Sequence, residues 1–86
     1  MSSPDDRQER FIRLVGQRVR ACREAAGITQ SRLERDAGLR PTTIAELERG
    51  EHDLEVYDLY RVAGVLGVDV RGLLPADGEP DQEPAG

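Results

Sequence analysis

The stretch QSRLERDAGLRPTTIAELERG, residues 30–50, predicts two short helices joined by a tight turn. Thr29 stands directly ahead of the first helix, where its side-chain oxygen can accept a hydrogen bond from an exposed N–H group of the next turn. Leu33 and Ala37 lie four residues apart and give that helix one apolar edge. Gly38 follows, and a left-handed residue after a helix is least costly when it has no Cβ. The first helix is therefore expected to end before Gly38.

The second half of the stretch predicts another short helix that stops at Gly50. The fixed φ of Pro41 suits the first position of this helix, and Ile44 and Leu47 give it an apolar edge. Two helices of about two turns each cannot bury enough surface alone, so other segments must cover them. A helix, a turn containing glycine and a second helix form a unit that many proteins place in the major groove of DNA.

A longer helix is predicted ahead of this unit. Ser3-Pro4-Asp5-Asp6 combines a capping hydroxyl, a proline and two acids near the positive end of the helix dipole, and Gly27 ends the run after Ala26. Apolar residues along one face are expected in the core: Phe11, Val15, Val19, Cys22 and Ala26. Gly16 lies inside this helix, so we expect a bend or a fraying first part.

Two more short helices are predicted after Gly50. Residues 51–54 form a loop in which Asp53 could cap a fourth helix, and Gly67 ends that helix. Its core residues are expected to be Val56, Leu59, Val62, Ala63 and Leu66. A fifth helix fits residues 70–74, with Asp69 as its cap. Residues 76–86 contain four acids and little to bury, so we expect a disordered acidic tail. The sequence thus predicts an all-α, compact, five-helix fold.

Composition excludes several classes of function. The chain has 86 residues and one cysteine, so no internal disulfide can form. It has neither a signal-like start nor an apolar run of about 18 residues, so we expect a soluble cytoplasmic protein without membrane contact. Cys22 is expected to fill core space and His52 to be a solvated loop residue. No arrangement typical of catalysis, of a metal site, of a cofactor or of a small-molecule ligand is evident, so an enzyme is not expected.

Charge is distributed unevenly along the chain. The net charge of −5 argues against a nucleic-acid partner when it is taken as a whole. Residues 7–50, however, contain ten arginines and six acids and carry +4, whereas residues 51–75 carry −3 and residues 76–86 carry −4. Positive charge is therefore concentrated in the half that contains the two short helices, where contact with phosphate would be needed.

The order of elements resembles the Cro and phage-repressor family of helix-turn-helix proteins, often called XRE-type. The likeness covers about residues 14–75 and rests on residues at matching spacings: Val19, Arg23, Gly27, Ile28-Thr29-Gln30, Leu33, Gly38-Leu39, Thr43-Ile44, Leu47-Glu48-Arg49-Gly50, Leu66-Gly67-Val68 and Leu73-Leu74. The resemblance implies a lambda-repressor-like DNA-binding domain over residues 14–75, with residues 1–13 as an N-terminal extension of the first helix.

The same resemblance implies roles for individual residues in binding double-stranded DNA. The positions that contact bases in the family are Arg40, Pro41, Thr42, Thr43 and Glu46. Contacts with phosphate are implied for Arg23, Thr29, Gln30 and Arg49, and an ion pair between Arg23 and Glu48 would link the first helix to the third. Ordinary exposed side chains remain an alternative for Gln30 and Arg49. Arg40 can present two donors to guanine, and Thr42 can offer a hydroxyl or a methyl group to a base edge.

Three positions depart from the family pattern. Glu34 occupies a position that is usually alanine, so we expect either that its side chain tilts outward, toward Arg40, or that the second and third helices stand further apart. The loop over residues 51–55 contains three acids, and Arg40 stands where a capping residue is usual. These departures predict weak or salt-sensitive DNA binding, and they leave open a protein-interaction module, antitoxin-like or an adaptor, that kept the fold.

A homodimer is expected, because one short helix reads about four or five base pairs and two copies can read a pseudo-palindrome. Tyr57, Tyr60 and Gly64 form a second edge of the fourth helix and are the candidate dimer surface, although a satellite of the monomer core is an alternative. The expected function is that of a small transcriptional regulator, a repressor or autoregulator, which a regulatory protein partner could control.

Overall fold

The computed structural model describes residues 4–75, which fold into four α-helices and one short 3₁₀ helix: α1 (Pro4–Ala26), α2 (Gln30–Ala37), α3 (Thr43–Glu48), α4 (Val56–Leu66) and η1 (Val70–Leu73). The expected all-α fold is confirmed for this part of the chain. The fifth helix is a correction, because it is a 3₁₀ helix of four residues and not an α-helix. The acidic tail over residues 76–86 and the first three residues lie outside the described part.

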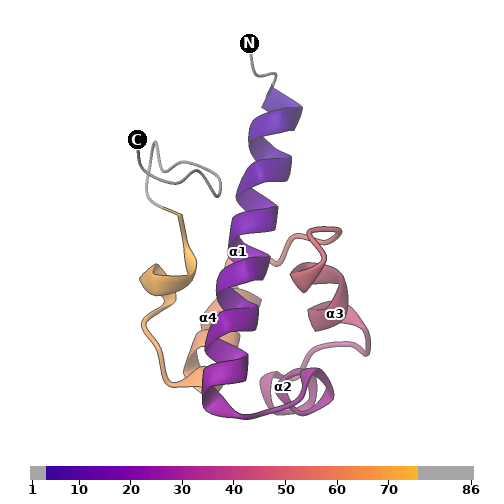
Figure 1. The fold of residues 1–86 in the computed structure, drawn as a ribbon. Helices are drawn as coiled ribbons and strands as arrows, with labels where there is room; N and C mark the ends of the chain where they lie inside the picture. Colours follow the sequence, from indigo (N-terminus) through magenta and orange to yellow (C-terminus); the bar gives the residue numbers. More distant parts are fainter. Residues whose placement is uncertain (1–3, 76–86) are drawn as a thin grey trace.

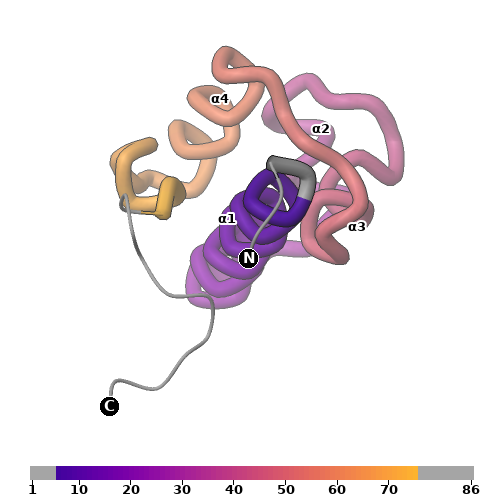
Figure 2. Tube along the Cα trace, turned by 90° about the horizontal axis from the view of Figure 1, so that it is seen from above, coloured from indigo at the N-terminus to yellow at the C-terminus, as the bar shows by residue number. Residues whose placement is uncertain are grey.

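α1 is the element around which the others are arranged (Figure 1). The view along α1 shows α2 and α3 on one side of it, and α4 and η1 on another (Figure 2). α1 packs against α3, η1 and α4, while α2 packs against α3 and α4. α1 therefore supports α3, and α4 supports α2.

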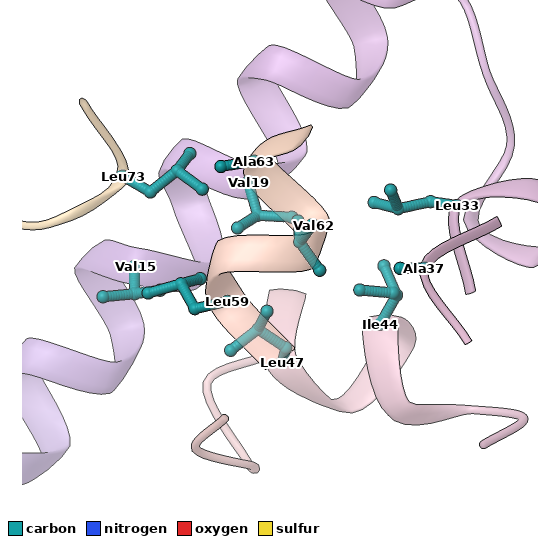
Figure 3. Close-up of a cluster of buried hydrophobic side chains, with 10 residues drawn as sticks. All are labelled: Val15, Val19, Leu33, Ala37, Ile44, Leu47, Leu59, Val62, Ala63 and Leu73. Carbon is teal, nitrogen blue, oxygen red and sulfur yellow. The ribbon is translucent and has the colours of Figure 1, made fainter. Parts of the chain in front are cut away.

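The core contains the apolar residues that the short helices were expected to contribute. Leu33 and Ala37 from α2 and Ile44 and Leu47 from α3 are at most 2% exposed. They meet side chains from the other elements in one cluster (Figure 3): Val15, Val19, Leu59, Val62, Ala63 and Leu73. The predicted inner edges of α2 and α3 are thus confirmed, and their other faces are left for solvent or a ligand.

The predicted core stripe of α1 is wrong at both of its ends. Phe11 is 40% exposed and Ala26 is also exposed, whereas Leu14, which the stripe omitted, is 5% exposed. The first turns of α1 extend beyond α3 and η1 (Figure 1), so Phe11 has no full layer of neighbours. Val56 is a similar correction: it is the first residue of α4 and is 84% exposed.

Gly16 has a packing role that its position in the sequence did not reveal. α1 runs without interruption from Pro4 to Ala26, and Gly16 is buried within it. A Cβ on Gly16 would overlap the carbonyl oxygen of Leu47 and would lie 3.2 Å from the Cα of Glu48. The absence of a side chain therefore lets the backbone of α1 approach the end of α3.

Candidate nucleic-acid interface

The surface around the start of α3 contains all five predicted base-reading residues. Because Ile44 and Leu47 turn the opposite side of α3 into the core, Thr43 and Glu46 are half-buried rather than covered. The preceding turn is more open, and its three residues are exposed: Arg40, Pro41 and Thr42. The structure therefore brings these side chains together on one polar surface.

The first residue of α3 was predicted wrongly. α3 begins at Thr43, so Pro41 and Arg40 belong to the turn, and Thr42 is the N-cap residue. Thr42 has φ 69°, and it is the one non-glycine residue with positive φ in the part of the chain from 4 to 75. Its side chain makes no capping hydrogen bond, and its hydroxyl instead donates to Oε2 of Glu46 at 3.4 Å.

Glu34 is buried, and the expected outward tilt is therefore wrong. The residue is 8% exposed, and its Oε2 accepts a hydrogen bond from the backbone N–H of Ile44 at 2.8 Å. This carboxylate satisfies an N–H group that the side chain of Thr42 leaves without a cap. The sequence gives no direct signal of this contact, because Thr42 is itself of a residue type that can cap a helix with its own oxygen.

The other end of α3 is held by a polar network around Glu48. Arg23 donates from Nε to Oε2 of Glu48 at 2.8 Å and from Nη2 to Oε1 at 3.0 Å, which is the ion pair that the resemblance implied. Gln30 donates from its side-chain nitrogen to the same Oε1 at 3.0 Å. The hydrogen bonds that Arg23 donates to the Glu48 carboxylate raise the pKa of Arg23 above its usual value. α1, α2 and α3 are thus joined through one carboxylate.

Thr29 and Arg49 lie near the two ends of the unit. Thr29 is the N-cap of α2, as predicted, and its hydroxyl oxygen accepts from the N–H of Arg32 at 3.0 Å. Arg49 is exposed and pairs with Glu51 at 3.1 Å, an interaction that raises the pKa of Arg49. Glu51, in the loop after α3, therefore competes with any other anion for the Arg49 guanidinium.

A hollow of about 650 Å³ separates the turn before α3 from the loop that leads to α4. Arg40, Thr42 and Glu46 line the hollow together with His52 and Asp53 of the loop. Asp53 does not cap α4, because the N-cap residue is Glu55 and it makes no side-chain capping bond. The acids of this loop therefore stand beside the candidate interface.

Arg61 of α4 is a contact that sequence reasoning missed. Its guanidinium donates to Asp58 at 2.8 Å, lies 5.0 Å from the centre of the Tyr57 ring, and approaches Gly38 so closely that a Cβ there would lie 2.8 Å from Nη1. Gly38 also has φ 72°, as expected for its position after α2. The turn thus needs glycine for its positive φ, whereas the end of the flexible Arg61 side chain could move away from an added Cβ.

The predicted second edge of α4 is exposed in the monomer. Tyr57 and Tyr60 are 67% and 63% exposed, and a Cβ on Gly64 would meet no atom within 4 Å. A hollow of about 400 Å³ beside Tyr60 and Gly64 is lined also by Val68 and Val70. This edge is therefore not a satellite of the monomer core.

Other kinds of site find no support in the part of the chain that the structure describes. Cys22 is half-buried at the edge of the core cluster, and residues 4–75 contain no group of three side chains suited to hold a metal ion. None of the described helices has the length and apolar character needed to cross a membrane.

Comparisons with known proteins agree with this architecture. The model of the helix-turn-helix family matches residues 19–73. The immunity repressor protein of Bacillus phage phi105 is 35% identical over 60 residues, which cover 70% of this chain but 42% of the repressor. An uncharacterized HTH-type transcriptional regulator of Sinorhizobium fredii is 35% identical over 69 residues, which cover 79% of this chain and 90% of that protein.

Two solved structures share the fold. The restriction-modification controller protein C.AhdI from Aeromonas hydrophila has a TM-score of 0.70 and 28% identity, over 73% of this chain and 96% of the controller. The hypothetical transcription factor NHTF from Neisseria has a TM-score of 0.71 and 25% identity, over 83% of this chain and 81% of that chain.

Proposed function

Because the chain belongs to the XRE-type helix-turn-helix family of transcription regulators, which are not enzymes, we propose that it binds double-stranded DNA sequence-specifically through α3. The observation that carries this proposal is the exposed polar surface at the start of α3, opposite the buried Ile44 and Leu47. A helix with one buried edge and one exposed polar edge can enter the major groove without disturbing the core.

Arg40 and Thr42 are the principal base readers in this proposal. The guanidinium of Arg40 can donate two hydrogen bonds to O6 and N7 of guanine, and Thr42 can contact a base edge through its hydroxyl or methyl group. Thr43 lies on the same surface, while Pro41 contributes shape. Glu46 accepts from Thr42 in the free protein, and its charge disfavours wrong sequences more than it attracts a right one.

Phosphate contacts are assigned to Arg23, Thr29, Gln30 and Arg49. One N–H of the Gln30 amide is used by Glu48, and the amide carries a second N–H that a phosphate oxygen can accept. The Arg49 guanidinium pairs with Glu51, so phosphate has to displace that carboxylate. This competition should weaken binding, while each phosphate that the chain neutralises should add to the fall of affinity as salt rises.

A selection from a random duplex library, followed by fluorescence anisotropy at several salt concentrations, tests the proposal. The chain should retain a defined duplex, and log affinity should fall linearly with log salt. Arg40→Ala should weaken binding to that duplex by about tenfold or more and should relax base choice at one position. Gln30→Ala should weaken binding to all duplexes alike.

Arg7→Ala is the matched control, because it removes the same charge from an exposed position at the far end of α1. Equal losses of affinity for Arg40→Ala and Arg7→Ala would mean that Arg40 attracts DNA through its charge alone and reads no base. Failure to retain any duplex at low salt would favour the alternative, a protein-interaction module that kept the fold, for which the exposed acidic loop is the supporting feature.

The DNA-binding form is proposed to be a homodimer that uses the edge of α4. Tyr57 and Tyr60 stand exposed on this edge, and Tyr60 borders a hollow in which Val68 and Val70 could receive an aromatic side chain from a second copy. Tyr60→Ala should shift the monomer–dimer equilibrium toward monomer, measured by sedimentation equilibrium. Phe11→Ala is the comparison, because Phe11 is the exposed apolar residue of the N-terminal extension. A larger shift toward monomer in Phe11→Ala than in Tyr60→Ala would indicate that the dimer interface lies on α1.

The regulatory role proposed is that of a repressor or autoregulator. The names of two similar proteins, an immunity repressor and a restriction-modification controller, support this role. The chain spans less than half the length of that repressor. Control by a regulatory protein partner is part of this proposal. A reporter gene under the selected duplex should lose expression when the chain is supplied.

A further inference from the structure

Glu34 binds the backbone at both ends of the segment that leads into α3. Its main-chain carbonyl accepts from the N–H of Leu39 at 2.8 Å, and its carboxylate accepts from the N–H of Ile44 at 2.8 Å. Residues 40–43, which carry four of the five base contacts proposed above, lie between these two bonds. One buried residue of α2 therefore spans the whole turn.

The carboxylate also takes over a task that usually belongs to the N-cap residue. A threonine at this position normally adopts an extended conformation and caps the helix with its own oxygen. Thr42 is left-handed instead, and its hydroxyl donates to Glu46. Because Glu34 accepts the N–H of Ile44, the hydroxyl of Thr42 is not needed inside the turn.

We propose that Glu34 is a positioning residue for DNA recognition: it caps α3 from within α2 and so keeps Thr42 left-handed, with Arg40 and Thr42 directed toward the groove. Without this carboxylate, the simplest way to satisfy Ile44 N–H is for Thr42 to become extended and cap α3 itself. That change would turn the side chains of the turn and alter base selection, while the phosphate contacts remain. The proposal rests on the proposed function.

Three variants separate the parts of this proposal. Glu34→Ala removes the acceptor, whereas Glu34→Gln keeps an oxygen that can accept from Ile44 N–H and replaces the other oxygen with an uncharged NH2 group. Asp36→Ala is the matched control, because it removes the same charge from the same helix at an exposed residue that pairs with Arg32. All comparisons are made at a temperature at which circular dichroism shows each variant to be folded.

The first measurement needs no DNA. Hydrogen exchange followed by NMR is measured in a Thr42→Gly background, in which no hydroxyl at position 42 can cap α3 in place of Glu34. Adding Glu34→Ala should make the Ile44 amide exchange about tenfold faster, since a capping bond of ordinary strength is lost. Adding Glu34→Gln or Asp36→Ala should leave the rate close to that of the background chain. An unchanged Ile44 exchange rate on adding Glu34→Ala would overturn the capping step and the proposal with it.

The second measurement is the ratio of the dissociation constants for a scrambled and a library-selected duplex. This ratio should fall by about tenfold in Glu34→Ala and should be recovered in Glu34→Gln. Binding of the scrambled duplex should change equally in Glu34→Ala and Asp36→Ala, because each loses one negative charge. An unchanged ratio, which means that the affinities for both duplexes change by the same factor, would overturn the positioning role.

The two measurements also distinguish this proposal from the proposed function. If the original chain retains no duplex, the proposed function fails, and the Ile44 exchange rate alone then decides whether Glu34 caps α3. If the chain selects a duplex and Glu34→Ala leaves the selection unchanged, the proposed function stands and the role of Glu34 in recognition is refuted.

Discussion

The two ends of α3 are held in different ways. At its C-terminal end, Glu48 accepts three hydrogen bonds from Arg23 and Gln30, and the backbone at Leu47 lies against Gly16. At its N-terminal end, an exposed turn with one left-handed threonine is attached through one carboxylate of α2. The C-terminal end of α3 is thus part of the buried interior. The N-terminal end is held by a buried side chain of α2, while the side chains of its own turn remain exposed.

This difference predicts where substitutions will act. Contacts at the C-terminal end are buried and join three helices, so losing them should lower the free energy of unfolding. Contacts at the N-terminal end involve few buried atoms. Losing them should therefore change the orientation of the exposed side chains around the start of α3 more than it lowers the free energy of unfolding. Four substitutions, ordered by the expected size of their effect, test this division.

Gly16→Ala should have the largest effect on stability. The new Cβ overlaps the carbonyl oxygen of Leu47, so α1 and α3 must separate, and we expect a loss of about 3 kcal/mol in urea unfolding. Gly64→Ala is the control, because Gly64 also lies inside a helix but has open space around it. It should stabilise the domain by up to about 1 kcal/mol. Similar effects of the two substitutions would contradict the close approach of α1 to α3.

Glu48→Ala should have the next largest effect. It leaves the guanidinium of Arg23, whose side chain is 12% exposed, without its carboxylate, and we expect a loss of about 2–3 kcal/mol in urea unfolding. Glu24→Ala is the control, because the Arg20–Glu24 pair is exposed and should contribute less than about 0.5 kcal/mol. A loss for Glu48→Ala no greater than for Glu24→Ala would show that the network does not hold this end of α3.

Thr42→Gly should act in the opposite direction. Glycine adopts the left-handed conformation without the Cβ clash of threonine, so we expect the free energy of unfolding to rise by up to about 1 kcal/mol. Thr43→Gly, one residue later and inside α3, should lower it by about 1 kcal/mol. Thermal unfolding of the pair measures the difference, and equal destabilisation would mean that Thr42 is not held in a strained conformation.

Sequence reasoning was successful where the determining interactions are local. Periodicity predicted that Leu33 and Ile44 are buried, and the preference of glycine for positive φ predicted the end of α2 at Gly38. The Arg23–Glu48 pair, which joins residues 25 positions apart, came from the family resemblance and not from local pattern. The fold could thus be predicted closely, apart from the type of its last helix and the start of α3.

The remaining features depend on where neighbouring elements lie. The helical pattern placed Phe11 on the inner face of α1 but could not show that the neighbouring elements end before it. Glu34 was predicted to face outward because its partner could not be foreseen. The N–H of Ile44 needs an acceptor outside α3 only because α3 begins at Thr43, two residues later than predicted. The contact of Arg61 with Gly38 likewise needs the packing of α4 on α2.

The start of η1 offers a contrast to the start of α3, because its cap is local. Asp69 accepts from the N–H of Arg71 and pairs with the Arg71 guanidinium at 2.9 Å, and these bonds lower the pKa of Asp69 from 3.8 to about 2. A carboxyl group whose pKa is lower in the folded state stabilises that state above pH 3.8, and the contribution disappears as pH falls toward 2. Asp69→Asn should therefore lower stability slightly near neutral pH, and its difference from the original chain should shrink over that interval.

Urea unfolding at several pH values measures this difference, and Asp53→Asn, in the exposed loop before α4, is the control for losing one charge. Because Asp69 and Arg71 are both well exposed, the effect should be the smallest of the four. A difference between Asp69→Asn and the original chain that persists unchanged to pH 2 would show that η1 does not depend on the charged form of its own cap. In that case the Asp69 cap of η1 would be no more sensitive to pH than Asp53 in the loop. Glu34 at the start of α3 would then be the one cap of the two that acts through its carboxylate.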